Sequence, residues 1–171
     1  MRLSCSSRAI LLSIRTNVSG TAPGGVYVDQ DIIEAIRQDH EQIMKVLDDL
    51  GVHGRATSEA YSVARGLLYS HMYGEEVTIY ERMRSEMYER IEDSLAEHNS
   101  IRICLDRLDR IEIGTEWVPT IQVLKRRVQF HIDSEERLLK AAESFIDTSE
   151  RFEIAERFQR AKGAQSSYTL A

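Results

Sequence analysis

Apolar residues recur at alternating steps of three and four along most of this 171-residue chain. The clearest stretch consists of the apolar residues Ile121, Leu124, Val128, Leu138, Ala142 and Phe145, with His131 and Glu135 at the two positions between them. Such spacing places its members on one face of an α-helix. The chain contains only two prolines that could interrupt such helices. The pattern therefore predicts a fold built from long amphipathic helices.

Three further stretches have the same rhythm. Asp31 and Glu34 have the spacing of a capping box, which predicts a helix start. We expect helices over about 31–50, from 58 into the eighties, over 91–108 and over 121–145. The second connection lacks glycine and proline, so it is placed near Ser85–Tyr88 because the chain must turn there. Four such helices predict an all-α fold, an antiparallel up-down-up-down four-helix bundle over residues 29–148.

The two ends of the chain differ from this pattern. Residues 1–28 contain no acidic residue and end near the loop-like TAPGG, and their apolar run AILLSI is short for a secretory signal. We expect a disordered leader there, with a start codon assigned too far upstream or a targeting segment as alternatives. Residues 149–171 are predicted to form a short amphipathic helix over one end of the bundle, followed by a disordered tail.

Composition narrows the class of partner and compartment. The net charge is −6 and the pI about 5.4, with no basic stripe, which argues against nucleic acid as a partner. No apolar run approaches the roughly 20 residues needed to span a bilayer, so no membrane association is expected. Two cysteines without a Cys-x-x-Cys spacing favour a reducing, cytoplasmic location.

Four of the five histidines occupy the apolar face of a predicted helix, one on each helix: His40, His71, His98 and His131. Glu75 and Glu135 follow two of them by four residues and therefore share their helix faces. The fifth, His53, lies in a predicted loop and is expected to be solvated. Buried imidazoles and carboxylates are costly unless they are paired or bind a metal.

The positions of the turns test whether these side chains could meet. Residues equally distant from the turn of an antiparallel hairpin lie at the same level. The sequence midpoint between His40 and His71 falls in the first loop. The midpoint between His98 and His131 falls at the break near Gly114. Glu75 and His98 are centred on the second connection. The six side chains are therefore predicted to lie within one or two layers of the core.

Four imidazoles and two carboxylates suit a pair of first-row transition metal ions. The first half of the chain contributes His40 and the His71–Glu75 pair, and the second half contributes His98 and the His131–Glu135 pair at similar spacing. This repeat predicts a pseudo-twofold site with terminal histidines and bridging glutamates. Iron, manganese and zinc all accept such ligands, so spacing leaves the metal open.

The ordered set DH (39–40), HMYGEEVTIY (71–80), EH (97–98) and HIDSEE (131–136) resembles the hemerythrin-like, HHE cation-binding family. The resemblance covers about residues 29–148. It implies a four-helix bundle with a non-haem di-iron centre, that is, two iron ions as cofactor. It also implies a ligand set of His40, His71, Glu75, His98, His131 and Glu135.

Two departures from the family pattern bear on function. Oxygen-carrying hemerythrins have a further histidine where this chain has Arg102, and they take the last carboxylate from the position of Glu136. We favour Glu135, which lies on the helix seam, and keep Glu136 as the alternative. The loss of one imidazole argues against a simple reversible oxygen carrier.

The resemblance thus implies a protein that binds O2, NO or iron for sensing, storage or buffering. One alternative is a di-iron redox enzyme acting on peroxide or nitric oxide, with Tyr73, Tyr80 or Tyr88 supplying a proton or an electron. Another is a metal-stabilised interaction scaffold. Two rival motifs are missing from the sequence: the Glu-x-x-His of ferritin-like carboxylate centres and the His-Glu-x-x-His of zinc proteases.

Overall fold

Six helices account for most of residues 30–52 and 57–169, the part of the chain that the computed structural model describes. They are α1 (Ile32–Leu50), α2 (Ser58–Glu76), α3 (Ile79–Met83), α4 (Tyr88–Leu108), α5 (Trp117–Phe145) and α6 (Thr148–Thr169). Asp31 caps α1 as predicted, because its side chain accepts hydrogen bonds from the backbone N–H groups of Ile33 and Glu34.

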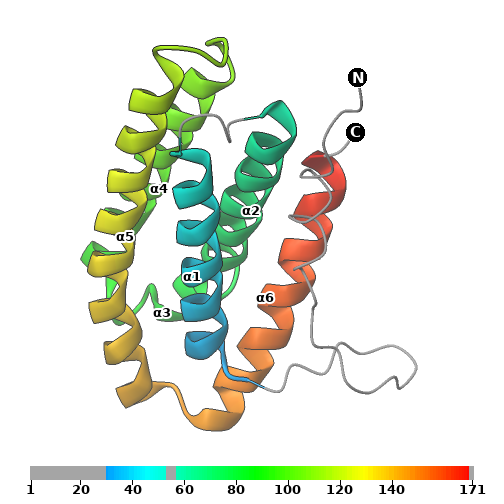
Figure 1. Ribbon diagram of the computed structural model, residues 1–171. Coiled ribbons are helices and arrows are strands. Elements are labelled where there is room, and N and C mark those ends of the chain that lie inside the picture. Colours follow the sequence, from blue (N-terminus) through cyan, green and yellow to red (C-terminus); the bar gives the residue numbers. More distant parts are fainter. Residues whose placement is uncertain (1–29, 53–56, 170–171) are drawn as a thin grey trace.

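The four long helices α1, α2, α4 and α5 run alternately up and down and form an antiparallel bundle (Figure 1). The predicted fold class, an all-α four-helix bundle with an extra C-terminal helix, is confirmed. The turn between the second and third bundle helices falls at residues 84–87, next to its predicted position. None of the helices described is long and apolar enough to span a membrane.

The prediction of one continuous second helix from Ser58 into the eighties is wrong at two residues. The helix stops at Glu76, and Thr78 has φ −131° and ψ −87°, outside the helical region. Val77 and Thr78 are β-branched and so are poorer helix formers. The Thr78 hydroxyl donates a 2.6 Å hydrogen bond to the carbonyl of Gly74, which satisfies an acceptor at the helix end. The chain then continues as the five-residue helix α3.

The fourth bundle helix begins earlier than the sequence pattern predicts. The predicted helix over 121–145 starts at Trp117 as α5, and Pro119 lies in its first turn. Proline is tolerated there because the first N–H groups of a helix have no intrahelical acceptor. Trp117 is buried, so the extra turn adds apolar contacts to the core.

Helix α6 is longer than predicted and is placed differently. It continues to Thr169 instead of giving way to a disordered tail, and it packs along α1 and α2 rather than over one end of the bundle (Figure 1). Ile154, Ala155 and Phe158 are buried in this contact, which explains why the segment stays helical. The predicted leader, residues 1–28, lies outside the described part of the chain.

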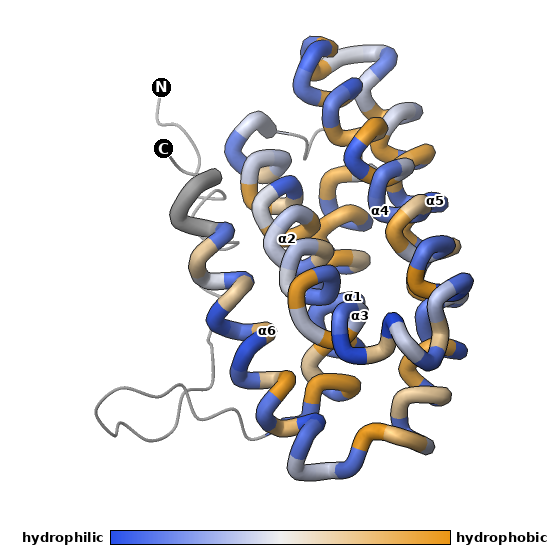
Figure 2. Tube along the Cα trace, turned by 180° about the vertical axis from the view of Figure 1, so that it is seen from behind, coloured by the Kyte–Doolittle hydropathy of each residue, from blue (hydrophilic) through white to orange (hydrophobic). Residues whose placement is uncertain are grey.

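The core consists of two apolar clusters with a polar layer between them. Along α1, Ile36 belongs to one cluster and Ile43 to the other, and His40 lies between the two. On α4 and α5 as well, His98 and His131 lie between residues of the two clusters. Figure 2 shows how hydrophobic positions alternate with hydrophilic ones along the helices. The buried polar layer is therefore enclosed by apolar side chains above and below it.

The contact between α2 and α6 leads to a first prediction. A Cβ atom on Gly74 would lie 2.7 Å from two ring carbons of Phe158, whereas a Cβ on Gly66 of the same helix has no neighbour within 4 Å. We expect Gly74→Ala to lower the free energy of unfolding by about 1–3 kcal/mol through overpacking. Gly66→Ala should raise it by about 0.5–1 kcal/mol through helix propensity. Urea unfolding of the metal-free proteins measures both, and equal stabilisation by the two changes would contradict the close α2–α6 packing.

Candidate metal centre

The six side chains predicted to share a layer come together in the middle of the bundle. His40 comes from α1, His71 and Glu75 from α2, His98 from α4, and His131 and Glu135 from α5. All six are buried, and both glutamates have no exposed surface. Apart from His98, each offers one nitrogen or oxygen atom within a group whose members all lie within 4.8 Å of one another. His98 adjoins this group, with its Nε2 3.2 Å from the Nε2 of His131.

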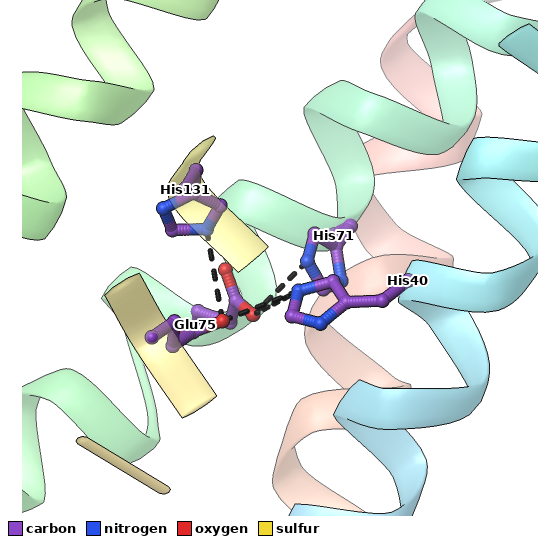
Figure 3. A group of neighbouring side chains, drawn as sticks. His40, His71, Glu75 and His131 are labelled. Carbon is purple, nitrogen blue, oxygen red and sulfur yellow. Dashed lines mark ion pairs between the residues drawn. The ribbon is translucent and has the colours of Figure 1, made fainter. Parts of the chain in front are cut away.

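The four imidazoles form two neighbouring pairs. The rings of His40 and His71 are 4.8 Å apart, and those of His98 and His131 are 4.6 Å apart. One pair thus belongs to α1 and α2, and the other to α4 and α5. Figure 3 shows the imidazoles of His40, His71 and His131 gathered around the carboxylate of Glu75.

The two carboxylates lie between the imidazole pairs. Glu75 Oε1 is 3.0 Å from His71 Nε2 and 3.8 Å from His40 Nε2, and its Oε2 is 3.2 Å from His98 Nε2. Glu135 Oε2 is 3.2 Å from His40 Nε2 and 3.6 Å from His131 Nε2. Each glutamate therefore contacts histidines of both pairs, as a bridging carboxylate would.

In three of the imidazoles, Nδ1 contacts a carboxylate on the side of the ring that faces away from the centre. Asp39 contacts His71 at 3.2 Å, Glu97 contacts His131 at 2.9 Å, and Glu76 contacts His98 at 2.7 Å. Such contacts fix the ring orientation and direct Nε2 to the centre of the bundle, the arrangement common to metal-ligating histidines. Sequence analysis did not assign these carboxylates a role, although each directly precedes or follows one of the six central residues.

The chemistry of the inward-facing atoms fits a metal ion. Within the described residues, the buried side-chain atoms without a hydrogen-bond partner include His40 Nε2, His71 Nε2, both oxygens of Glu75 and Glu135 Oε2. Buried polar atoms are normally satisfied, and a cluster of unsatisfied ones requires an explanation. Convergent imidazole nitrogens and carboxylate oxygens are donors that first-row transition ions accept.

The electrostatics of the cluster show that its carboxylates need positive charge beside them. Burial alone would lower the pKa of His71, but the carboxylates of Glu75 and Asp39 outweigh burial and raise that pKa to about 10. Burial disfavours the charged form of Glu75, yet His71 and His98 hold its pKa well below its usual range. Glu75 is thus an anion that requires neighbouring positive charge, which protons on the imidazoles or metal ions can supply.

The two residues that depart from the family pattern have defined positions. Arg102 does not face the centre, since its Nη2 donates a 2.7 Å hydrogen bond to Glu76 Oε1, the atom that also contacts His98. Glu136 pairs with Arg37 and half of its side chain is exposed, whereas Glu135 is fully buried. The structure therefore brings Glu135 into the cluster and leaves Glu136 outside it.

Of the three tyrosines considered from the sequence, only Tyr80 reaches the cluster. Its phenol donates a 2.5 Å hydrogen bond to Glu135 Oε1, and its ring stacks on His98 at 5.5 Å. Burial and the carboxylates of Glu135 and Glu75 raise the pKa of Tyr80 well above its usual value, so the phenol stays protonated. Tyr73 and Tyr88 are exposed. His53 lies outside the described residues.

Comparisons with known proteins give one family match and a shared fold. The model of a family described as the hemerythrin HHE cation binding domain matches residues 31–142. A similar solved structure is that of a hemerythrin HHE cation binding domain-containing protein from Mycobacterium kansasii. It covers 82% of this chain and 90% of its own length, with a TM-score of 0.73 and 19% identity, which shows a shared fold. No curated protein matches this chain.

Proposed function

The chain belongs to the hemerythrin HHE cation-binding domain family, and from this membership we propose that it is a non-haem di-iron protein. In this proposal His40 and His71 hold one ion, His98 and His131 hold the other, and Glu75 and Glu135 bridge them. The centre binds O2 or NO, or the iron itself is the cargo, for sensing, storage or buffering. Metal binding as such is supported by the cation-binding family and by the buried histidine–glutamate cluster.

The position of Glu75 is the observation that supports two ions rather than one. Its Oε1 faces His71 and His40, while its Oε2 faces His98. A carboxylate whose two oxygens face different imidazole pairs is suited to bridge two cations. Two imidazoles and two carboxylate oxygens per ion are fewer than the six ligands of an octahedral site, so a small exogenous ligand has room to bind.

Iron is the metal proposed, because the family pattern implies it and the donor set accepts it; manganese and zinc accept the same donors. Oxygen-carrying hemerythrins have one more histidine beside the pair that corresponds to His98 and His131, and this chain lacks it. Arg102 replaces it and is engaged with Glu76, so it donates no lone pair to a metal. We therefore propose a sensor or an iron-handling protein rather than a transport protein.

Metal analysis followed by optical spectroscopy tests this proposal. Protein purified without added metal is expected to contain about two iron ions per chain. The reduced protein should give a persistent absorption band with O2 or with NO. Zinc in place of iron, or iron that affects stability but exchanges no external ligand, would instead support the metal-stabilised scaffold.

A second candidate function, a redox enzyme acting on peroxide or nitric oxide, is favoured by one contact. The buried phenol of Tyr80 lies on Glu135 and could supply a proton close to the centre. The same iron-loaded protein should then consume peroxide or NO in the steady state, and Glu75→Ala should abolish this consumption. Oxidation by O2 without a persistent band, together with sustained turnover, would favour this enzyme over the binding protein.

A further inference from the structure

The pseudo-twofold centre has two unlike sides. One side faces α6, which packs on α1 and α2 (Figures 1 and 2), and the other faces α4 and α5. Within residues 30–52 and 57–169, the additional helix α6 therefore lies on the side of His40 and His71 and not on that of His98 and His131. This difference determines from which side a small molecule can approach.

Helix α6 covers His71. Phe158 is fully buried and presents its ring edge-on to His71, with ring centroids 6.2 Å apart. Gly74 allows this approach, because any Cβ there would overlap with the Phe158 ring. Lys162, one turn further along α6, pairs with Asp39 and lies 5.0 Å above the Phe158 ring. A buried aromatic ring and an ion pair thus lie over His71.

The opposite side contains a cavity of about 190 Å³ between α4 and α5. Its lining consists of Arg90, Asp93, Ser94, Ser134, Arg137 and Leu138. Ser94 lies four residues before His98, and Ser134 lies three residues after His131, so the cavity shares its helix faces with this imidazole pair. The cavity is therefore about one helical turn from His98 and His131.

A short chain of polar contacts leads from the cavity to the centre. Ser94 is buried and is a hydrogen-bond partner of the Tyr80 phenol, which in turn donates to Glu135 Oε1. Two side chains thus separate the cavity from an atom of the proposed bridging carboxylate. A connection between the two requires both buried side chains, Ser94 and Tyr80, to move.

The charge of the cavity favours anions. Arg90 and Arg137 contribute two positive charges against the single carboxylate of Asp93. Within residues 30–52 and 57–169, neither arginine takes part in a salt bridge, so both guanidinium groups can interact with an incoming anion. A second cavity, of about 320 Å³, is lined by Tyr80 itself, but its charged lining is Glu76 and Glu81 against one arginine, Arg84. That balance would repel an anion.

We infer that small anions reach the centre from the α4–α5 side, through the cavity between Arg90 and Arg137, and bind at the ion held by His98 and His131. The inference rests on the proposed di-iron function and assigns the side of entry and the charge of the ligand. Arg90 and Arg137 attract the anion, and Ser94 and Tyr80 form the inner end of the route.

Azide is the probe that tests this inference, because its binding to the oxidised, iron-loaded protein can be followed by absorbance. Ser94→Met and Ser134→Met fill the cavity from α4 and from α5, and each should slow azide binding about tenfold or more. Two separate variants are needed because Ser94 is buried and its replacement could disturb folding. Iron content and circular dichroism are measured for each variant.

Charge is tested separately from shape. The double variant Arg90→Gln and Arg137→Gln should slow azide binding about fivefold at low ionic strength, and the difference should shrink in high salt. Binding of uncharged NO to the reduced protein should be unchanged by the arginine variant. Glu81→Gln, in the second cavity, is the matched control and should not slow azide.

Two outcomes would overturn the inference in different ways. If wild-type iron-loaded protein shows no azide band, the proposed function fails and the inference fails with it. If the band forms at the same rate in both serine variants, or if Glu81→Gln speeds azide binding, the route is wrong while the di-iron centre stands.

Discussion

In the Glu75→Ala protein, bound iron is expected to fall from about two ions per chain to less than one. Glu75 contacts His71 and His40 through one oxygen and His98 through the other, so its loss removes a donor from both proposed ions at once. Glu135→Ala should have a similar effect, because Glu135 Oε2 lies near a histidine of each pair. Elemental analysis of purified protein, scaled to protein concentration, measures the change.

Glu136→Ala is the matched control for this experiment. It removes the same side chain one position further along α5, where the carboxylate pairs with Arg37 near the surface. Exposed ion pairs contribute little to stability, so this variant should fold and keep its full iron content. Iron loss in Glu136→Ala together with retention in Glu135→Ala would reverse the assignment of the ligand.

Iron is also expected to raise the thermal stability of the protein by at least about 10 °C. An ion present at a thousandfold excess over its Kd contributes about 4 kcal/mol of folding free energy, and each kcal/mol shifts Tm by about 2–4 °C in a protein of this size. Without metal, the inward-facing atoms of His40, His71 and Glu75 lack hydrogen-bond partners. Differential scanning calorimetry before and after chelation measures the shift.

The Glu75→Ala protein again supplies the comparison for this stability experiment. Its Tm should depend only weakly on iron, because the ions that stabilise the native state are not retained. An equal Tm for the iron-loaded and the chelated wild-type protein, with the change in iron content verified, would contradict a metal-stabilised core.

The bundle and the meeting of its six central side chains could be predicted because both follow from simple periodicities. A step of four residues places His71 beside Glu75, and His131 beside Glu135, on one helix face. Equal distance from a turn sets two residues of a hairpin at the same level. These rules need no knowledge of side-chain packing, and the six side chains do lie together in the structure.

Other features depend on tertiary contacts that the periodicities do not contain. The supporting carboxylates lie on the faces next to the seam, where the sequence pattern of Asp39 or Glu97 is that of an ordinary surface residue. The course of α6 depends on the space that Gly74 leaves for Phe158, which no helical repeat reveals. The helix end at Glu76 depends on the hydrogen bond from Thr78 to Gly74.

That helix end has a consequence for the register of the chain. In an uninterrupted helix each residue turns about 100° from the previous one, so Tyr80 would point well away from the direction of Glu75. The two non-helical residues between α2 and α3 reset this angle and aim the phenol at Glu135. Deleting or inserting one residue there would swing Tyr80 aside while His71 and Glu75 keep their places. The presence of a phenol at this centre therefore depends on the length of the two-residue segment between α2 and α3, and a change in that length alters none of the proposed ligands.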